Sequence, residues 1–188
     1  MFRGSSLVSN DSLQFIAYYD PEGNVVVGKR NIDSDRWILS LTQYTGNVND
    51  AHNVISLGLD GSGTLHLSFD HHGHPLRYCR AKAPGLLEFG ELQSMTGQDE
   101  QDVTYPEFYS MPDGDLLFAY RAGASGRGNF ILNRYDHKTG QWRRVHDVII
   151  DGEGERNAYW QMHVDGAGVI YLSWAVSYTH LTLPTTSR

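Results

Sequence analysis

A short motif of alternating apolar residues recurs along this chain at a nearly fixed spacing. Its clear copies begin at Gly63, Gly114 and Gly168, which are 51 and 54 residues apart, and a weaker copy begins at Ser12. Each clear copy is preceded by an Asp-Gly turn signal and a short apolar run, and this order predicts a β-hairpin. A period of about fifty residues is typical of folds that repeat one small antiparallel sheet.

Further strands complete each repeat. Third strands are expected at 24–30, 75–80 and 129–135, and Trp37 and Trp142 mark fourth strands. No segment has a convincing helical stripe, so we predict an all-β chain. Four short strands per unit are typical of a β-propeller blade, and the chain would hold roughly three and a half blades. A β-sandwich is the alternative, but it does not explain hairpins at a near-constant offset.

The repeat also divides the chain. We expect one domain over 1–175, a partial propeller whose fragment would leave apolar sheet faces uncovered. Residues 176–188 break the pattern and resemble translated sequencing-adapter read-through, so we expect them to be a non-native tail. The expected blade units are 3–45, 50–95, 103–150 and 157–175.

Composition excludes several classes of protein. The net charge is −7 and argues against nonspecific nucleic-acid binding, and no apolar run is long enough for a membrane-spanning helix. The lone Cys79 excludes an internal disulfide and a multi-cysteine metal site. We therefore expect no nucleic-acid partner and no membrane partner, and we expect a monomer.

Equivalent positions in neighbouring blades should meet around the propeller axis. Counting back eight residues from the Asp of each Asp-Gly turn reaches His52, Tyr105 and Asn157, and Tyr159 lies two residues further on. The spacing therefore places an imidazole and a phenol in one pocket, where they would form an acid/base pair.

A histidine-rich turn lies in the same unit as His52, at Asp70 to His74. One interpretation is a solvated polar turn. A second is a metal site in which His72, His74 and His52 are the ligands. A third places only His72 in the pocket, where it would orient or neutralise a substrate. The spacing alone leaves all three open.

Arg121 follows an aromatic strand end at Tyr120 and also allows two interpretations. It is either an ordinary surface residue or a guanidinium that holds a carboxylate, as a uronic acid substrate would require. Arg127 and Arg134 are alternatives in the same unit. Trp160, His163 and Trp174 are expected to pack between blades.

At these residues the sequence resembles the BNR-repeat propeller family and, within it, the ulvan lyases, polysaccharide lyases that cleave a sulfated algal polysaccharide. The segments that carry the resemblance are 50–56, 66–73, 104–108 and 118–121. The resemblance implies a seven-bladed propeller with a pocket at one end of its axis. It also implies that His52 and Tyr105 supply the base and the acid, in an order that the sequence leaves open, beside a second histidine, His72, and Arg121 against the uronate carboxylate.

The resulting prediction is a lyase that cleaves a uronic-acid-containing, ulvan-like polysaccharide by β-elimination. We predict His52, Tyr105, His72 and Arg121 as catalytic residues and an anionic polysaccharide as the partner. Arg121, His72, Asn53 and Tyr159 are the predicted substrate-binding residues. No metal is predicted at this site and no cofactor for catalysis, although structural calcium or zinc is allowed in the full-length protein, which we expect to be secreted or periplasmic. The alternatives are a sialidase-like glycoside hydrolase and a noncatalytic carbohydrate-binding propeller.

Overall fold

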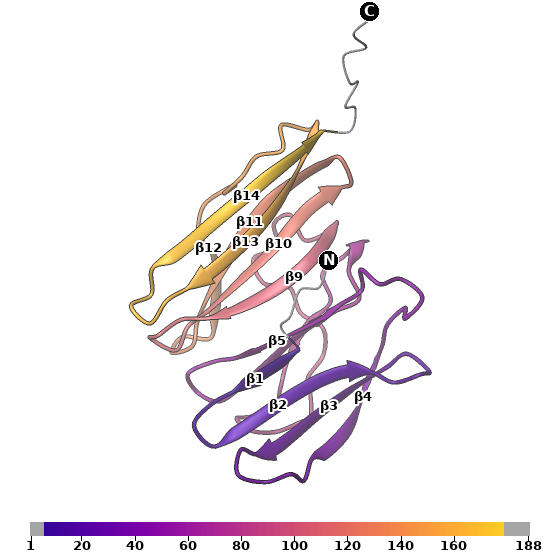
Figure 1. Ribbon diagram of the computed structural model, residues 1–188, viewed down its shortest axis with the longest axis vertical. Helices are drawn as coiled ribbons and strands as arrows, with labels where there is room; N and C mark the ends of the chain where they lie inside the picture. Colours follow the sequence, from indigo (N-terminus) through magenta and orange to yellow (C-terminus); the bar gives the residue numbers. More distant parts are fainter. Residues whose placement is uncertain (1–5, 179–188) are drawn as a thin grey trace, which may run out of the picture.

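The computed structural model describes residues 6–178, and side chains as far as Ala175. These residues form strands joined by turns and contain no helix, as predicted (Figure 1). No helix able to cross a membrane occurs among them. The strands are β1 (Leu7–Ser9), β2 (Leu13–Tyr19), β3 (Asn24–Asn31), β4 (Ile38–Thr45), β5 (Ile55–Leu59), β6 (Leu65–Phe69), β7 (His72–His74), β8 (Tyr78–Arg80), β9 (Val103–Ser110), β10 (Leu116–Ala124), β11 (Arg127–Asp136), β12 (Gln141–Arg144), β13 (Arg156–Val164) and β14 (Ile170–Tyr178).

The strands form consecutive antiparallel units in chain order. The first unit is the sheet β1-β2-β3-β4, and the second is the sheet β5-β6-β8. The third is the run β9-β10-β11-β12, and the fourth is the hairpin β13-β14. One parallel pair, Gly128 with Asn157, joins the last two units into a seven-stranded sheet that also includes β7.

Successive units stack face to face, and alternation along each strand explains how. On β10, Phe118 and Tyr120 point into a core that also contains Tyr78 of the second unit. Leu117 and Ala119 alternate with them and point into a core on the other side of the sheet, against the fourth unit. Both faces of an inner unit are therefore buried, because the side-chain period of a strand is two and both sets of positions are apolar.

The outer units have no such cover within residues 6–178. Ile38, Leu39 and Leu41 on β4 and Tyr171 and Trp174 on β14 are exposed apolar side chains. Trp174 was expected to pack between blades, but 57% of it is exposed. The expected tail begins within β14, which runs to Tyr178, and residues 179–188 lie outside the described part.

The tight hairpin turns correct one detail of the predicted register. Asp60 and Asp165 each bond through Oδ1 to backbone N–H groups two and four residues ahead. In the third unit the backbone bonds place Met111 at this position, so Asp113 is not the equivalent of Asp60. The glycines Gly63, Gly114 and Gly168 do align, and all three have the positive φ that the turn requires.

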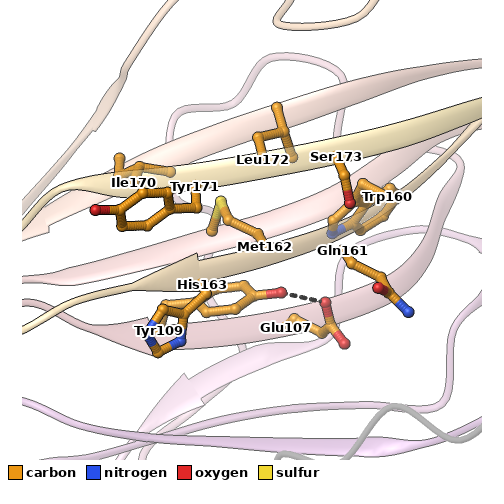
Figure 2. A pocket seen from close by; sticks show the side chains of 10 residues that line it. All are labelled: Glu107, Tyr109, Trp160, Gln161, Met162, His163, Ile170, Tyr171, Leu172 and Ser173. Carbon is orange, nitrogen blue, oxygen red and sulfur yellow. Dashed lines mark hydrogen bonds between the residues drawn. The ribbon is translucent and has the colours of Figure 1, made fainter.

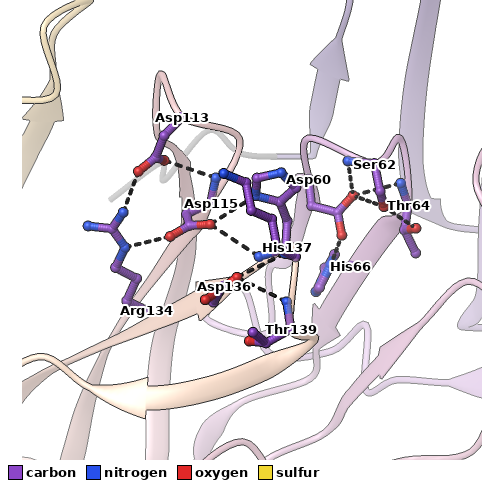
Figure 3. Close-up of polar contacts among 11 residues, drawn as sticks. Asp60, Ser62, Thr64, His66, Asp113, Asp115, Arg134, Asp136, His137 and Thr139 are labelled. Atoms are coloured by element: carbon purple, nitrogen blue, oxygen red, sulfur yellow. Dashed lines mark hydrogen bonds and ion pairs between the residues drawn. The ribbon is translucent and has the colours of Figure 1, made fainter.

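Two neighbouring polar groups lie at the turns of the second and third units, and a backbone hydrogen bond joins the turns. We call the two groups together the turn network, and its members are Asp60 and His66 in one group and Asp113, Asp115, Arg134 and His137 in the other (Figure 3). The backbone N–H of Gly61 donates to the carbonyl of Gly114 at 2.7 Å, and a Cβ on Gly61 would lie 2.7 Å from the Gly114 Cα. Glycine is needed here because the two backbones touch.

Two strand predictions need correction near the predicted site. His72 and His74 were placed in a turn, but they form the short strand β7, which pairs with β9 of the next unit. Arg121 was placed at a strand end, but β10 continues to Ala124, because Arg121 still pairs with Thr104 of β9 and Phe130 of β11. His72, His74 and Arg121 are therefore all held in place by strand pairing.

Candidate functional site

His52 lies in the loop that leads into β5, and Asp50 shapes that loop. The Asp50 Oδ1 atom accepts the His52 backbone N–H at 2.9 Å and contacts the His52 Nδ1 at 2.7 Å. Asn53 is buried in the same loop and donates from its amide nitrogen to the carbonyl of Asn47. An aspartate two residues before a histidine thus makes a local turn that fixes the ring.

His72 is brought to the same carboxylate from β7. The second oxygen of Asp50 contacts the His72 Nδ1 at 2.6 Å, and the rings of His52 and His72 stack with centroids 4.1 Å apart. The side chains of His52 and His72 are 48% and 36% exposed, so both rings border solvent. The pKa of Asp50 is held far below its usual value, chiefly by the bond from the His52 backbone N–H and then by the His72 and His52 side chains.

The ionised carboxylate determines which ring atoms carry protons. A carboxylate only accepts hydrogen bonds, so the network assigns a proton to Nδ1 of His52 and to Nδ1 of His72. When either ring is neutral, its Nε2 then has a lone pair on the side away from Asp50. A neutral imidazole in this tautomer accepts a proton at Nε2.

Tyr105 reaches this histidine pair through an irregularity in β9. The register between β9 and β10 shifts between Ala119 and Arg121, and the backbone of Tyr105 has a φ of 58°. A bulge of this kind turns a side chain away from the direction that regular pleating gives it. The Tyr105 ring centroid lies 6.1 Å from that of His52. The strained backbone therefore places phenol and imidazole side by side.

Arg121 lies against Tyr105 and is almost fully buried. Its guanidinium carbon is 5.2 Å from the Tyr105 ring centroid, and its Nη2 donates to the Oγ1 of Thr104 at 3.0 Å. Only 3% of Arg121 is exposed, so the surface interpretation is wrong. A Cβ on Gly128 would lie 2.6 Å from the Arg121 Cδ, so the absence of a side chain at Gly128 makes room for this arginine.

Tyr159 extends the cluster toward the fourth unit. Its ring centroid lies 6.4 Å from that of Tyr105, and its hydroxyl accepts from the amide of buried Asn157 at 3.4 Å. Asn53, by contrast, is turned inward and holds the loop before β5. The structure thus brings His52, His72, Tyr105, Arg121 and Tyr159 together, and it gives Asn53 a role in shaping the loop.

The other histidines of the turn are divided between core and surface. His71 is fully buried, its Nε2 accepts the backbone N–H of Arg77 at 2.8 Å, and burial lowers its pKa to about 3. His74 is exposed, and its Nδ1 accepts the backbone N–H of His72. Among residues 6–178, the group of potential metal ligands whose atoms lie within 4.8 Å of one another is Asp50, His52 and His72, so Asp50 takes the place that the metal interpretation gave to His74.

A groove of about 810 Å³ lies elsewhere, on the face of the β13-β14 hairpin (Figure 2). It is lined by Trp160, Met162 and Tyr171 and by the hydrogen-bonded pair Tyr109 and Glu107. None of the predicted catalytic residues lines it. In the inner units the corresponding sheet face is covered by the next unit. We therefore regard this groove as a packing face that no unit covers within residues 6–178.

Sequence reasoning missed three residues that organise the site. Asp50 fixes both imidazoles, Gly128 makes room for Arg121, and Thr104 accepts from both Gly73 and Arg121. An Asp two residues before a His was a usable signal for Asp50. Thr104 and Gly128 gave none, because their roles depend on contacts between strands.

Comparison with known proteins then identifies the family. A family model described as "BNR repeat-containing family member" matches residues 13–183. The chain belongs to the BNR repeat family. A curated ulvan lyase (long isoform) of Pseudoalteromonas sp. (strain PLSV) is 27% identical over 135 residues, which cover 50% of this chain and 14% of that protein. A short-isoform ulvan lyase of Alteromonas sp. (strain LOR) is 41% identical over 56 residues, 27% of this chain and 11% of that protein.

Solved structures show the same relationship at the level of the fold. The polysaccharide lyase Uly1 superposes with a TM-score of 0.77 at 18% identity, covering 94% of this chain and 49% of that one. A PL25 ulvan lyase bound to -[GlcA(1-4)Rha3S]- superposes with a TM-score of 0.70 at 13% identity, covering 92% and 45%. This BNR-repeat chain therefore spans about half of the solved lyase chains and a smaller part of the curated relatives.

Proposed function

We propose that this BNR-repeat protein is a polysaccharide lyase that cleaves a uronic-acid-containing, ulvan-like polysaccharide by β-elimination. The observation that carries the proposal is the continuous set of contacts from His72 through His52 and Tyr105 to Arg121. It joins imidazole, phenol and guanidinium groups from different units. The distant similarity to ulvan lyases supports the same chemistry.

In this proposal His52 removes the C5 proton of the uronate and Tyr105 protonates the C4-linked oxygen as it leaves. The Nδ1 contact with Asp50 leaves the Nε2 of neutral His52 as the basic atom. The two side chains are adjacent, as proton abstraction and leaving-group protonation on one sugar require. Such acid and base steps each contribute about 10² to 10⁴-fold in rate.

The enolate that forms on the uronate needs positive charge nearby. His72 is the solvent-bordering group placed to meet the carboxylate, and Arg121 supplies a fixed charge beneath Tyr105. Preorganised electrostatic stabilisation of this type is typically worth about 3 to 4 kcal/mol. Because Arg121 is buried, we assign it to the electrostatics of the pocket and assign direct carboxylate contact first to His72. Tyr159 would offer a ring for stacking on the sugar.

The remaining expectations belong to the same proposal. The stacked units would be about three and a half blades of a seven-bladed propeller, with the tail from Val176 non-native. The partner would be an anionic polysaccharide, with no nucleic acid or membrane involved. The protein would be a secreted or periplasmic monomer and would need no catalytic cofactor, with structural calcium or zinc allowed in the full-length protein.

The test is the chemical nature of the product. Incubation of the protein with ulvan should release oligosaccharides with a 4,5-unsaturated terminal sugar, detected by ultraviolet absorbance and mass spectrometry. New reducing ends without unsaturation would indicate a sialidase-like hydrolase. Saturable binding of the polymer without any cleavage would indicate a carbohydrate-binding module, and either result would overturn the lyase proposal.

A further inference from the structure

Asp50, His52 and His72 present three donor atoms to one point near the surface. One ligand atom from each residue lies within 4.8 Å of the other two. Two ligands of a tetrahedral zinc ion lie about 3.3 Å apart, so small side-chain rotations would bring these atoms into ligand geometry. Two imidazoles and a carboxylate are a ligand set that borderline divalent ions such as Zn²⁺ accept.

The contacts of the cluster are compatible with metal binding. The Nδ1 atoms of His52 and His72 both contact Asp50, and an ion taking up these ligands would release the Nδ1 protons to solvent. Among residues 6–178, Asp50 pairs with these two histidines, and no lysine or arginine forms an ion pair with its carboxylate. No permanently charged side chain in this part of the chain therefore competes with a cation for the carboxylate.

The other two His-Asp groups among the described residues suit a cation less well, one because it is buried and the other because an arginine neutralises its carboxylate. Asp60 and His66 have side chains only 2% and 0% exposed, so no ion in solvent reaches them. Asp115 is neutralised by Arg134, to which it bonds at 2.7 Å. The cluster at Asp50 is the more open of these groups, since its side chains are 30% to 48% exposed.

From this geometry we infer that Asp50, His52 and His72 bind a divalent transition-metal ion of the Zn²⁺ type, with a fourth position open to water. The metal would occupy the imidazoles that the proposed β-elimination needs, so it would act as an inhibitor that competes with the polysaccharide. This inhibitory consequence rests on the proposed function, whereas the binding itself does not.

Direct titration of the protein, without a histidine tag, tests the site. Isothermal titration with Zn²⁺ should show one ion per chain, and Co²⁺ should give the visible absorption of a low-symmetry site. Asp50→Asn and His72→Ala should each weaken Zn²⁺ binding by roughly tenfold or more, as the loss of a ligand or of a group that orients one does. His163→Ala is the matched control, because His163 is also exposed but lies on β13.

The outcomes separate this inference from the lyase proposal. Equal Zn²⁺ affinity in the protein and in Asp50→Asn and His72→Ala, or no saturable binding, would overturn the metal site whatever the activity. Saturable binding that these variants weaken would support the site even if ulvan were never cleaved. If ulvan is cleaved, added Zn²⁺ should suppress product formation, and a chelator should restore it. Cleavage unaffected by saturating Zn²⁺ would overturn the inhibitory role.

Discussion

Two groups of histidine and aspartate side chains lie at opposite ends of the same hairpins. The site cluster, Asp50, His52, His72, Tyr105 and Arg121, gathers where β5 and β9 begin. The turn network gathers where the same two strands end (Figure 3). The two groups share residue types but differ in solvent exposure, in charge balance and in backbone strain.

Burial and pairing close the turn network to chemistry. Burial alone would raise the pKa of Asp60, but bonds from His66, Ser62 and Thr64 outweigh it and lower that pKa. The pKa of His66 is itself lowered by burial, so the pair is a hydrogen bond between a carboxylate and a neutral imidazole. Asp115 is likewise held by His137 and Arg134. Asp60, His66 and Asp115 therefore each have a partner and are largely buried.

The histidines of the site cluster, in contrast, border solvent. Both oxygens of Asp50 contact Nδ1 atoms, one on His52 and one on His72, and these side chains are 48% and 36% exposed. Tyr105 is kept at a positive φ by a bulge, a conformation that costs of order 1 to 3 kcal/mol and is often found at functional sites. The comparison teaches that the composition of a polar cluster says less about its role than its exposure and strain.

The largest expected effect is on the site cluster. Tyr105→Phe removes the proposed acid and leaves the ring in place, so we expect kcat on ulvan to fall by about 10² to 10⁴-fold. The urea unfolding midpoint should change little, because the Tyr105 ring still packs on Arg121. Tyr109→Phe on the same strand is the control, since the Tyr109 hydroxyl bonds Glu107 in the groove of Figure 2. Equal rates for the two variants would remove Tyr105 from the mechanism.

Substitutions in the turn network should lower stability and leave activity unchanged. Asp115→Ala leaves His137 without its carboxylate and removes one of the two carboxylates of Arg134, so we expect the free energy of unfolding to fall by about 1 to 3 kcal/mol. Activity per folded molecule should stay unchanged. Asp113→Ala, whose carboxylate is 53% exposed, should cost less than about 1 kcal/mol. A loss of turnover in folded Asp115→Ala protein would break the distinction between the two groups.

The sequence predicted the all-β class and the hairpins because the fold repeats one small unit. Alternation in Leu65 to Phe69 and the copies at later offsets predicted the hairpins that the structure contains, and the absence of a helical stripe predicted the absence of helices. The prediction of β7 as a turn failed because its pairing partner, Thr104, lies in another unit. Short strands that pair across units leave little periodicity in their own sequence.

The site was only partly predictable, and one part was reached through an incorrect register. Counting back from Asp113 reached Tyr105, although Asp113 is not equivalent to Asp60, and the bulge in β9 turned that residue toward His52. Neither the bulge nor the burial of Arg121 under Tyr105 can be predicted from the spacing of residues in the sequence. Asp50 had a local signal, because its turn is formed within three residues.

The smallest expected effect concerns His71, the buried neighbour of exposed His72. Burial lowers the pKa of His71 to about 3, whereas an unfolded histidine titrates near 6.5. The unfolded state therefore takes up a proton first as pH falls, so stability is full above about pH 7 and declines from there toward pH 3. Between pH 7 and pH 5.5, proton uptake by His71 in the unfolded state should lower the free energy of unfolding by about 1 kcal/mol.

The test is His71→Asn, which retains an acceptor for the Arg77 backbone N–H. Urea titrations at the two pH values should show a smaller drop in the free energy of unfolding for this variant than for the wild type. His72→Asn is the matched variant, because His72 is the next residue in the chain and its side chain is 36% exposed. If the free energy of unfolding falls equally with pH in His71→Asn and in the wild type, the buried ring does not contribute to acid sensitivity. Burial would then not distinguish His71 from its exposed neighbour in stability.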